Sequence, residues 1–160
     1  MAISPNNKIP AIVDPTGPGG EPLALFESGA ILQYLGNKTG LYYPTQPRPR
    51  AVCEQWLYWQ MAGLGPMTGQ AMHFIQYAPE RVPYGIERYT NEVMRLYGVL
   101  DRQLATSPFI AGAYSIADMA AYPWVVPHAK IGVDLAAYPH ILRWLAEIGG
   151  RPAVARAMAM

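Results

Sequence analysis

The chain has 160 residues, of which 51% are hydrophobic and only 14% are charged. This length suffices for one ordinary domain, or for one domain and part of another, and a charged fraction well below the usual ~25% excludes a charged disordered tail. Twelve Lys and Arg residues against eleven Asp and Glu residues leave a net charge of +1, which gives no electrostatic footprint for nucleic acid or an anionic membrane.

The apolar stretches are short and interrupted, so none is expected to cross a membrane. Residues 1–8 lack the basic-then-apolar order of a signal peptide, and we therefore expect a cytoplasmic protein. Cys53 is the only cysteine, which excludes a disulfide within the chain and a cysteine-rich zinc site. His73, His128 and His140 have no spacing typical of a metal site, so no metal is expected.

A β-hairpin is the first predicted element. Two short apolar runs, at 8–14 and 21–26, flank a cluster of Pro and Gly residues at 15–20. This pattern is typical of a hairpin with a longer loop.

A helix is predicted to follow the hairpin. Ser28 has the side chain of an N-cap, with Glu27 as an acid of the first turn, and Gly40 is a natural stop. Three prolines then fall within six residues over 44–49. This stretch is too stiff for a helix, so residues 41–49 are predicted to be an inter-domain linker.

The chain from Arg50 onward is predicted to be entirely helical. Gly63, Gly65 and Pro66 interrupt its first helix and predict a kink there. Pro83 fits the first turn of the next helix.

The sharpest local signal is a capping box over 115–118, in which Ser115 begins a helix and the Asp118 carboxylate reaches back to its backbone N–H. These two residues are interpreted as structural rather than catalytic. Pro123 predicts a bend in that helix, and Pro139 and Pro152 open two further helices.

Three separated segments, in this order, resemble the glutathione transferase family. They read Asn-Asn-Lys-Ile-Pro-Ala-Ile at 6–12, Glu-Ser-Gly-Ala-Ile at 27–31 and Ser-Ile-Ala-Asp at 115–118. A further set resembles the bacterial nu-class branch of the family, which acts as a glutathione-dependent disulfide reductase. That set is Pro66, Met67, Tyr84, Glu87, Arg88 and Tyr89.

The resemblance implies a mainly α fold. Residues 1–40 would form a partial thioredoxin-like α/β unit, made of the hairpin and one helix, and residues 50–160 an all-α C-terminal domain. In the family a strand–helix–strand unit and a short helix precede the Lys8 segment. A βαβ unit takes about 30 residues or more, whereas nine residues precede Pro10 here. We therefore expect the chain to lack that segment, through an internal start or as a natural remnant.

Six residues are assigned to glutathione binding by the resemblance: Lys8, Ile9, Pro10, Glu27, Ser28 and Arg88. The Ile9–Pro10 bond is expected to be cis, with the Ile9 backbone pairing with the cysteinyl part of glutathione as an added strand would. Lys8 would hold the glycyl carboxylate, together with Asn7 unless the latter is an ordinary turn residue.

The γ-glutamyl end of glutathione is assigned to the start of the predicted helix. Free backbone N–H groups there attract its carboxylate, Ser28 adds a donor, and Glu27 could bind its ammonium group. Arg88 would reach the same pocket, or else be a surface arginine paired with Glu87 or Glu92.

An apolar pocket for a second substrate has five candidate lining residues, each of which could instead belong to the core or a dimer contact. They are Met67, Met72, Phe74, Tyr77 and Tyr84. Cys53 is interpreted as a buried small hydrophobe rather than a nucleophile. The catalytic residue is unknown and is expected in the missing N-terminal segment.

The implied function is glutathione-dependent transfer or thiol–disulfide exchange, with glutathione or its disulfide as partner in a homodimer and with neither nucleic acid nor a membrane. The alternative is a non-catalytic dimerising or binding module of the same fold. The two alternatives, an enzyme and a non-catalytic module, differ in whether this chain itself turns over a substrate.

Overall fold

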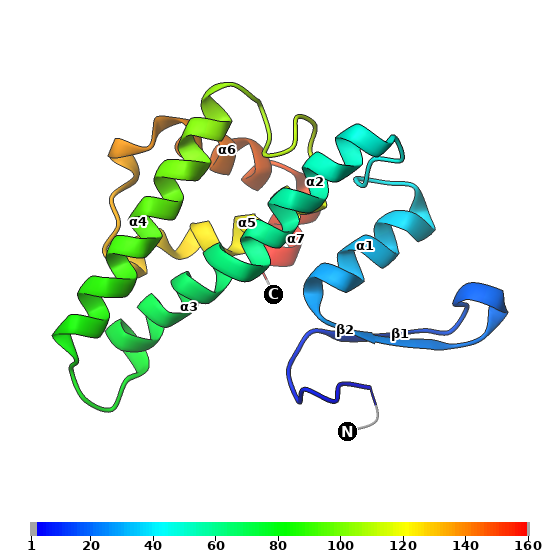
Figure 1. Cartoon of the computed structure of the whole chain (residues 1–160), viewed down its shortest axis with the longest axis horizontal. Helices are drawn as coiled ribbons and strands as arrows, with labels where there is room; N and C mark the ends of the chain where they lie inside the picture. The colour runs from blue at the N-terminus through cyan, green and yellow to red at the C-terminus, as the bar shows by residue number, and fades with distance from the viewer. Residues whose placement is uncertain (1–2, 160) are drawn as a thin grey trace.

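The computed structural model describes residues 3–159, which form a hairpin and helix on one side and a helical domain on the other (Figure 1). Strands β1 (Ala11–Asp14) and β2 (Leu23–Phe26) pair antiparallel, with Ala11 opposite Phe26. A 3-10 turn at Pro18–Gly20 lies in the loop between them. The predicted hairpin with a longer loop is confirmed.

Helix α1 (Ser28–Thr39) ends at Gly40, whose φ of 70° is left-handed, as glycine readily adopts. Its far end is fastened to the hairpin through Asp14. That carboxylate accepts hydrogen bonds from Lys38, from the Tyr34 hydroxyl and from the backbone N–H of Thr16. The hydrogen bond from Lys38 is the main reason that the pKa of Asp14 lies well below its usual value.

The predicted linker is shorter than expected, because α2 (Pro47–Trp59) begins inside it. The prolines at 47 and 49 were expected to exclude a helix, and that expectation is wrong. Both occupy the first turn, where backbone N–H groups have no intrahelical partner and the fixed φ of proline suits the helix.

A nearly continuous rod leads from α2 into α3 (Gly65–Met72) (Figure 1). At the position of the predicted kink the structure has a π turn, Gln60–Leu64, with helical backbone angles at both of its ends, and a second π turn, His73–Tyr77, follows α3. A π turn adds one residue to a helical turn and so accommodates a sequence that interrupts the regular pattern.

The remaining helices complete the all-α domain. Their bounds are α4 Pro83–Ala105, α5 Ile116–Val125, α6 Pro139–Gly149 and α7 Pro152–Met158, with 3-10 turns at Val126–Ile131 and Leu135–Ala137. The helix starts predicted at Pro83, Pro139 and Pro152 are confirmed. None of these described helices is long and apolar enough to span a bilayer.

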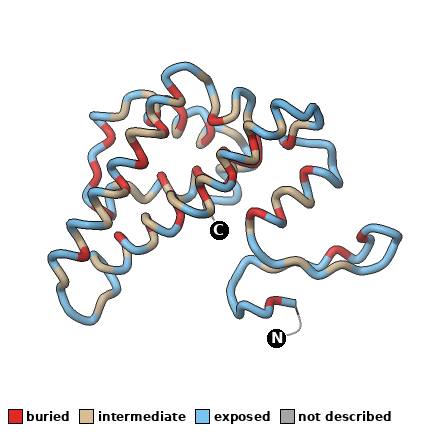
Figure 2. The backbone as a smooth tube through the Cα atoms, in the orientation of Figure 1, coloured by how far each residue is buried: buried red, intermediate tan, exposed pale blue. Residues whose placement is uncertain are grey.

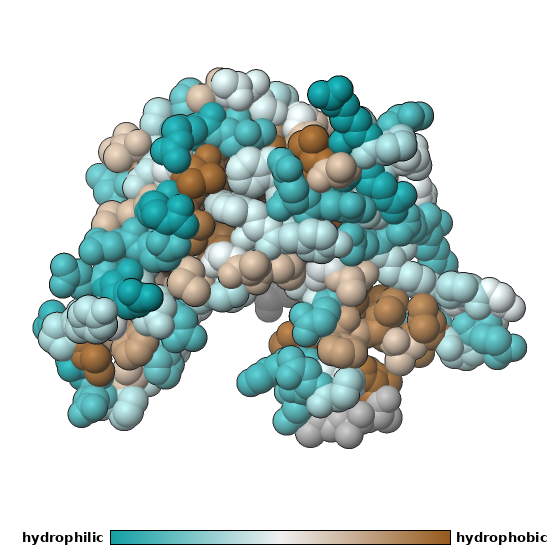
Figure 3. Space-filling view, viewed as in Figure 1, coloured by the Kyte–Doolittle hydropathy of each residue, from teal (hydrophilic) through white to brown (hydrophobic). Residues whose placement is uncertain are grey.

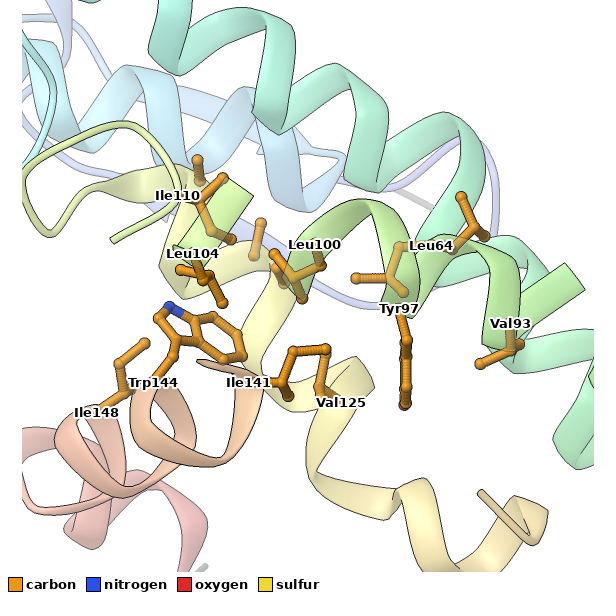
Figure 4. Close-up of a cluster of buried hydrophobic side chains, with 14 of the residues drawn as sticks. Leu64, Val93, Tyr97, Leu100, Leu104, Ile110, Val125, Ile141, Trp144 and Ile148 are labelled. Atoms are coloured by element: carbon orange, nitrogen blue, oxygen red, sulfur yellow. The ribbon is translucent and has the colours of Figure 1, made fainter. Parts of the chain in front are cut away.

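The core of this domain lies between α2, α3, α4, α5 and α6. Buried positions recur along these helices (Figure 2), and side chains from α4, α5 and α6 meet in the core (Figure 4). Trp144 of α6 is fully buried beside Leu104, and its indole N–H donates to Asp118 at 2.8 Å. Asp118 also accepts from the backbone N–H groups of Ile110 and Ser115, both at 3.0 Å. The predicted capping box is therefore confirmed, and it reaches further across the core than predicted.

Candidate functional site

The start of α1 borders a cavity of about 160 Å³. Its lining includes five of the six predicted glutathione-binding residues together with Phe26 and two residues that sequence reasoning missed. The five are Lys8, Ile9, Pro10, Glu27 and Ser28, and the two missed are Ser4 and Asn6. Segments separated by about twenty residues in the sequence therefore form one site.

The Ile9–Pro10 peptide bond is cis, as expected. Ile9 is 95% exposed and lines the cavity. Ser4 explains how this segment is held, because its buried hydroxyl donates to the carbonyl of Lys8 at 2.8 Å. Its position four residues before Lys8 carries no distinctive sequence signal.

Asn7 lies in a turn, with a φ of 55° and its backbone N–H bonded to the carbonyl of Ser4 at 3.0 Å. It does not line the cavity. The structure therefore favours the interpretation of Asn7 as a turn residue, since asparagine tolerates the left-handed region.

The expected N-cap at Ser28 is wrong. Glu27 is the N-cap residue, and neither its side chain nor the Ser28 hydroxyl caps the backbone. The Ser28 hydroxyl instead donates to the sulfur of Met61 at 3.7 Å. Since the first N–H groups of a helix have no intrahelical partners, the start of α1 keeps donors and a positive end of the helix dipole toward the cavity.

Glu27 has a φ of 71° and a ψ of 115°. A non-glycine residue with such a positive φ is strained by an amount of order 1–3 kcal/mol, and strain of this kind clusters at ligand sites. The residue also accepts the backbone N–H of Ile31 on its carbonyl at 2.9 Å, which fixes the turn into α1.

Arg88 is not brought to this cavity. It lies on α4, where its guanidinium carbon is 6.0 Å from the centre of the Tyr89 ring, and the start of α4 and the hairpin lie at opposite ends of the molecule (Figure 1). Neither Glu87 nor Glu92 forms an ion pair with it among residues 3–159.

A larger cavity of about 640 Å³ adjoins the first and shares Ile9, Pro10 and Ser28 with it. Its other walls come from α1, α3, α5 and the turn that follows α5. Of the five residues considered for a second-substrate pocket, Met72 alone lines it. Tyr77 and Tyr84 are exposed on the surface of the helical domain, and Phe74 stacks on Tyr89.

Cys53 is fully buried, and burial raises the pKa of its thiol, which disfavours the reactive thiolate. Within residues 3–159, no three His, Cys, Asp or Glu side chains are gathered to hold a metal ion. The polar groups around the cavity at the start of α1 are therefore backbone donors, hydroxyls, an amide, a lysine and a carboxylate.

Comparison with known proteins agrees with this architecture. Residues 83–147, from α4 into α6, match the family model described as "Glutathione S-transferase, C-terminal domain". The chain is 54% identical over 160 residues to disulfide-bond oxidoreductase YfcG of Escherichia coli, with 99% of this chain and 74% of YfcG covered. The chain belongs to the glutathione transferase family.

Two further members place this transferase-family chain among longer proteins. Disulfide-bond oxidoreductase YghU of E. coli is 43% identical, and the chain spans 56% of its length. A glutathione transferase family member from Pseudomonas fluorescens, solved with two glutathione molecules bound, superposes with a TM-score of 0.91 at 45% identity, covering 97% of this chain and 72% of that one. The resemblance predicted from three short segments is thus confirmed, as is the mainly α transferase fold.

Proposed function

We propose that this chain binds glutathione at the start of α1, through the cavity lined by Lys8, Ile9, Pro10, Glu27 and Ser28. The observation that carries the proposal is their convergence on one cavity beside an uncapped helix start. Arg88 lies outside this cavity, and the proposal does not depend on it.

Each part of glutathione has a matching group. The γ-glutamyl carboxylate is bound by backbone N–H groups of α1 and the Ser28 hydroxyl, as helix starts bind anions, and Glu27 pairs with the ammonium group. The Ile9 backbone pairs with the cysteinyl residue, and Lys8 with the glycyl carboxylate. A cavity of about 160 Å³ is below the 300–1,000 Å³ of ordinary ligand pockets, so part of the tripeptide lies outside it, in the adjoining cavity that shares Ile9, Pro10 and Ser28.

Thiol–disulfide exchange is the reaction that we propose for the bound glutathione, because both curated relatives are named disulfide-bond oxidoreductases. Its thiolate attacks one sulfur of a disulfide substrate, forming a mixed disulfide and releasing the other sulfur as a thiolate that takes up a proton. A second glutathione thiolate then attacks the mixed disulfide. The products are glutathione disulfide and a fully reduced dithiol or pair of thiols. The sulfur comes from the ligand, since Cys53 is buried.

Calorimetric titration with glutathione and with glutathione disulfide tests the proposal. We expect the wild-type chain to bind and Ser28→Ala to raise the dissociation constant about 10- to 100-fold, because a hydrogen bond to a charged group contributes roughly 1.5–3 kcal/mol. Ser107→Ala is the matched control, because the Ser107 hydroxyl donates a hydrogen bond to the Phe109 carbonyl and does not line this cavity. A folded wild-type chain that binds neither ligand would contradict the proposal.

We also propose that the chain forms a homodimer. Large apolar side chains are exposed on the hairpin, on the segment before it and on α1, including Ile9, Val13, Phe26 and Leu35. Apolar surface gathers on this part of the molecule (Figure 3). Contiguous exposed apolar surface marks interaction sites. Sedimentation equilibrium at micromolar concentration should give the mass of a dimer, and a monomer mass would count against it.

A further inference from the structure

The first two residues of α1 rest on one methionine of the helical domain. Met61 is the second residue of the π turn Gln60–Leu64 between α2 and α3. Its sulfur accepts the Ser28 hydroxyl at 3.7 Å. It also lies 3.2 Å from the position that a Cβ on Gly29 would occupy. The sulfur can therefore approach α1 closely because Gly29 has no side chain in its way.

The Ser28 hydroxyl can donate a hydrogen bond either to the Met61 sulfur or to a ligand carboxylate, and these two acceptors differ in strength. A thioether is a weak hydrogen-bond acceptor, whereas a carboxylate that accepts from a hydroxyl forms a charge-assisted bond about twice as strong as a neutral one. The Met61 sulfur can therefore orient the hydroxyl before a ligand binds, yet it is too weak an acceptor to keep the hydroxyl from a ligand carboxylate. A strong neutral acceptor in its place would retain the hydroxyl.

We propose that Met61 is a positioning residue for the glutathione site, which fixes the Ser28 hydroxyl and the start of α1 and releases that hydroxyl to the γ-glutamyl carboxylate. This inference rests on the proposed function. It assigns a role in ligand binding to the π turn, which lies 33 residues from Ser28 in the sequence. Turns of this type are frequent at functional sites.

Met61→Gln and Met61→Leu separate the role of the acceptor from that of packing. Glutamine has nearly the same length as methionine but carries a strong amide acceptor, and leucine is apolar without one. We expect Met61→Gln to raise the glutathione dissociation constant about three- to tenfold, because the amide retains the hydroxyl, and Met61→Leu to raise it about two- to threefold, because the hydroxyl then has no acceptor that fixes its direction. In a Ser28→Ala background the two variants should bind equally.

A general packing defect would weaken binding in both backgrounds, so equal effects of Met61→Gln with and without Ser28 would overturn the proposal. Wild-type affinity in Met61→Gln would also overturn it. The double-mutant comparison is needed because residues in contact do not act additively.

A readout without ligand tests the contact itself. In the chain labelled with ¹³C at the methionine methyl groups, Ser28→Ala should shift the Met61 signal, whereas Ser107→Ala should leave it in place. An unmoved Met61 signal would overturn the proposal. Failure of the wild-type chain to bind glutathione would instead overturn the proposed function, and the methyl signal would then decide the Met61 contact alone.

Discussion

Asp118→Ala is expected to lower the free energy of unfolding by about 3 kcal/mol or more. The carboxylate is fully buried and accepts from the Trp144 indole, from the backbone N–H groups of Ile110 and Ser115, and from the Ser115 hydroxyl. Alanine would leave several buried donors without an acceptor, and each costs roughly 1–3 kcal/mol. Burial raises the pKa of Asp118, against the effect of these donors.

Urea denaturation followed by tryptophan fluorescence measures this effect. Asp134→Ala is the matched control, because that exposed aspartate accepts the backbone N–H of Ala136 at the start of a 3-10 turn, and its loss should cost about 1 kcal/mol or less. If Asp118→Ala stays within 1 kcal/mol of wild type, the buried network is not what holds α5, α6 and the loop before α5 together.

Gly36→Ala is expected to lower the free energy of unfolding by about 1–3 kcal/mol and to weaken glutathione binding as well. A Cβ on Gly36 would lie 2.6 Å from the Cβ of Tyr43. Rotation of the Tyr43 side chain cannot move its own Cβ, and the residue is buried, so α1 must shift. Because α1 carries Ser28, the shift reaches the proposed ligand site.

Gly98→Ala provides the control for Gly36→Ala. Gly98 lies within α4, and an added Cβ would meet only the flexible end of Arg102 at 3.4 Å. Alanine there should stabilise the chain by up to about 1 kcal/mol, since glycine is a poor helix former. Thermal unfolding of both variants measures the difference, and a Gly36→Ala variant as stable as Gly98→Ala would refute the expected clash.

Local patterns predicted the elements that are determined locally. The hairpin follows from two apolar runs around a Pro/Gly loop, and the capping box from the Ser115 and Asp118 spacing. Residue identity alone was a poorer guide at helix starts. Ser28 is not the N-cap, because the strained Glu27 takes that place, and Pro47 begins a helix instead of preventing one.

Contacts between distant segments could not be predicted from one sequence. Trp144 is 26 residues from Asp118 and Met61 is 33 from Ser28, and no periodicity relates such pairs. Five of the six candidate site residues nevertheless meet in one cavity, because the resemblance to a family supplied what local patterns lack. Arg88 was assigned by the same resemblance but lies on α4, outside this cavity.

Helix α1 is supported at both ends. Met61 lies under its first turn, and its last turns pack on Tyr43 through Gly36 while Asn37 accepts from Arg50 at 2.7 Å. Two separated supports prevent the helix from rocking about either one. A carboxylate bound at its start, as proposed above, would meet donors whose direction is already set, so little conformational entropy would be lost on binding and the affinity would depend on the contacts themselves.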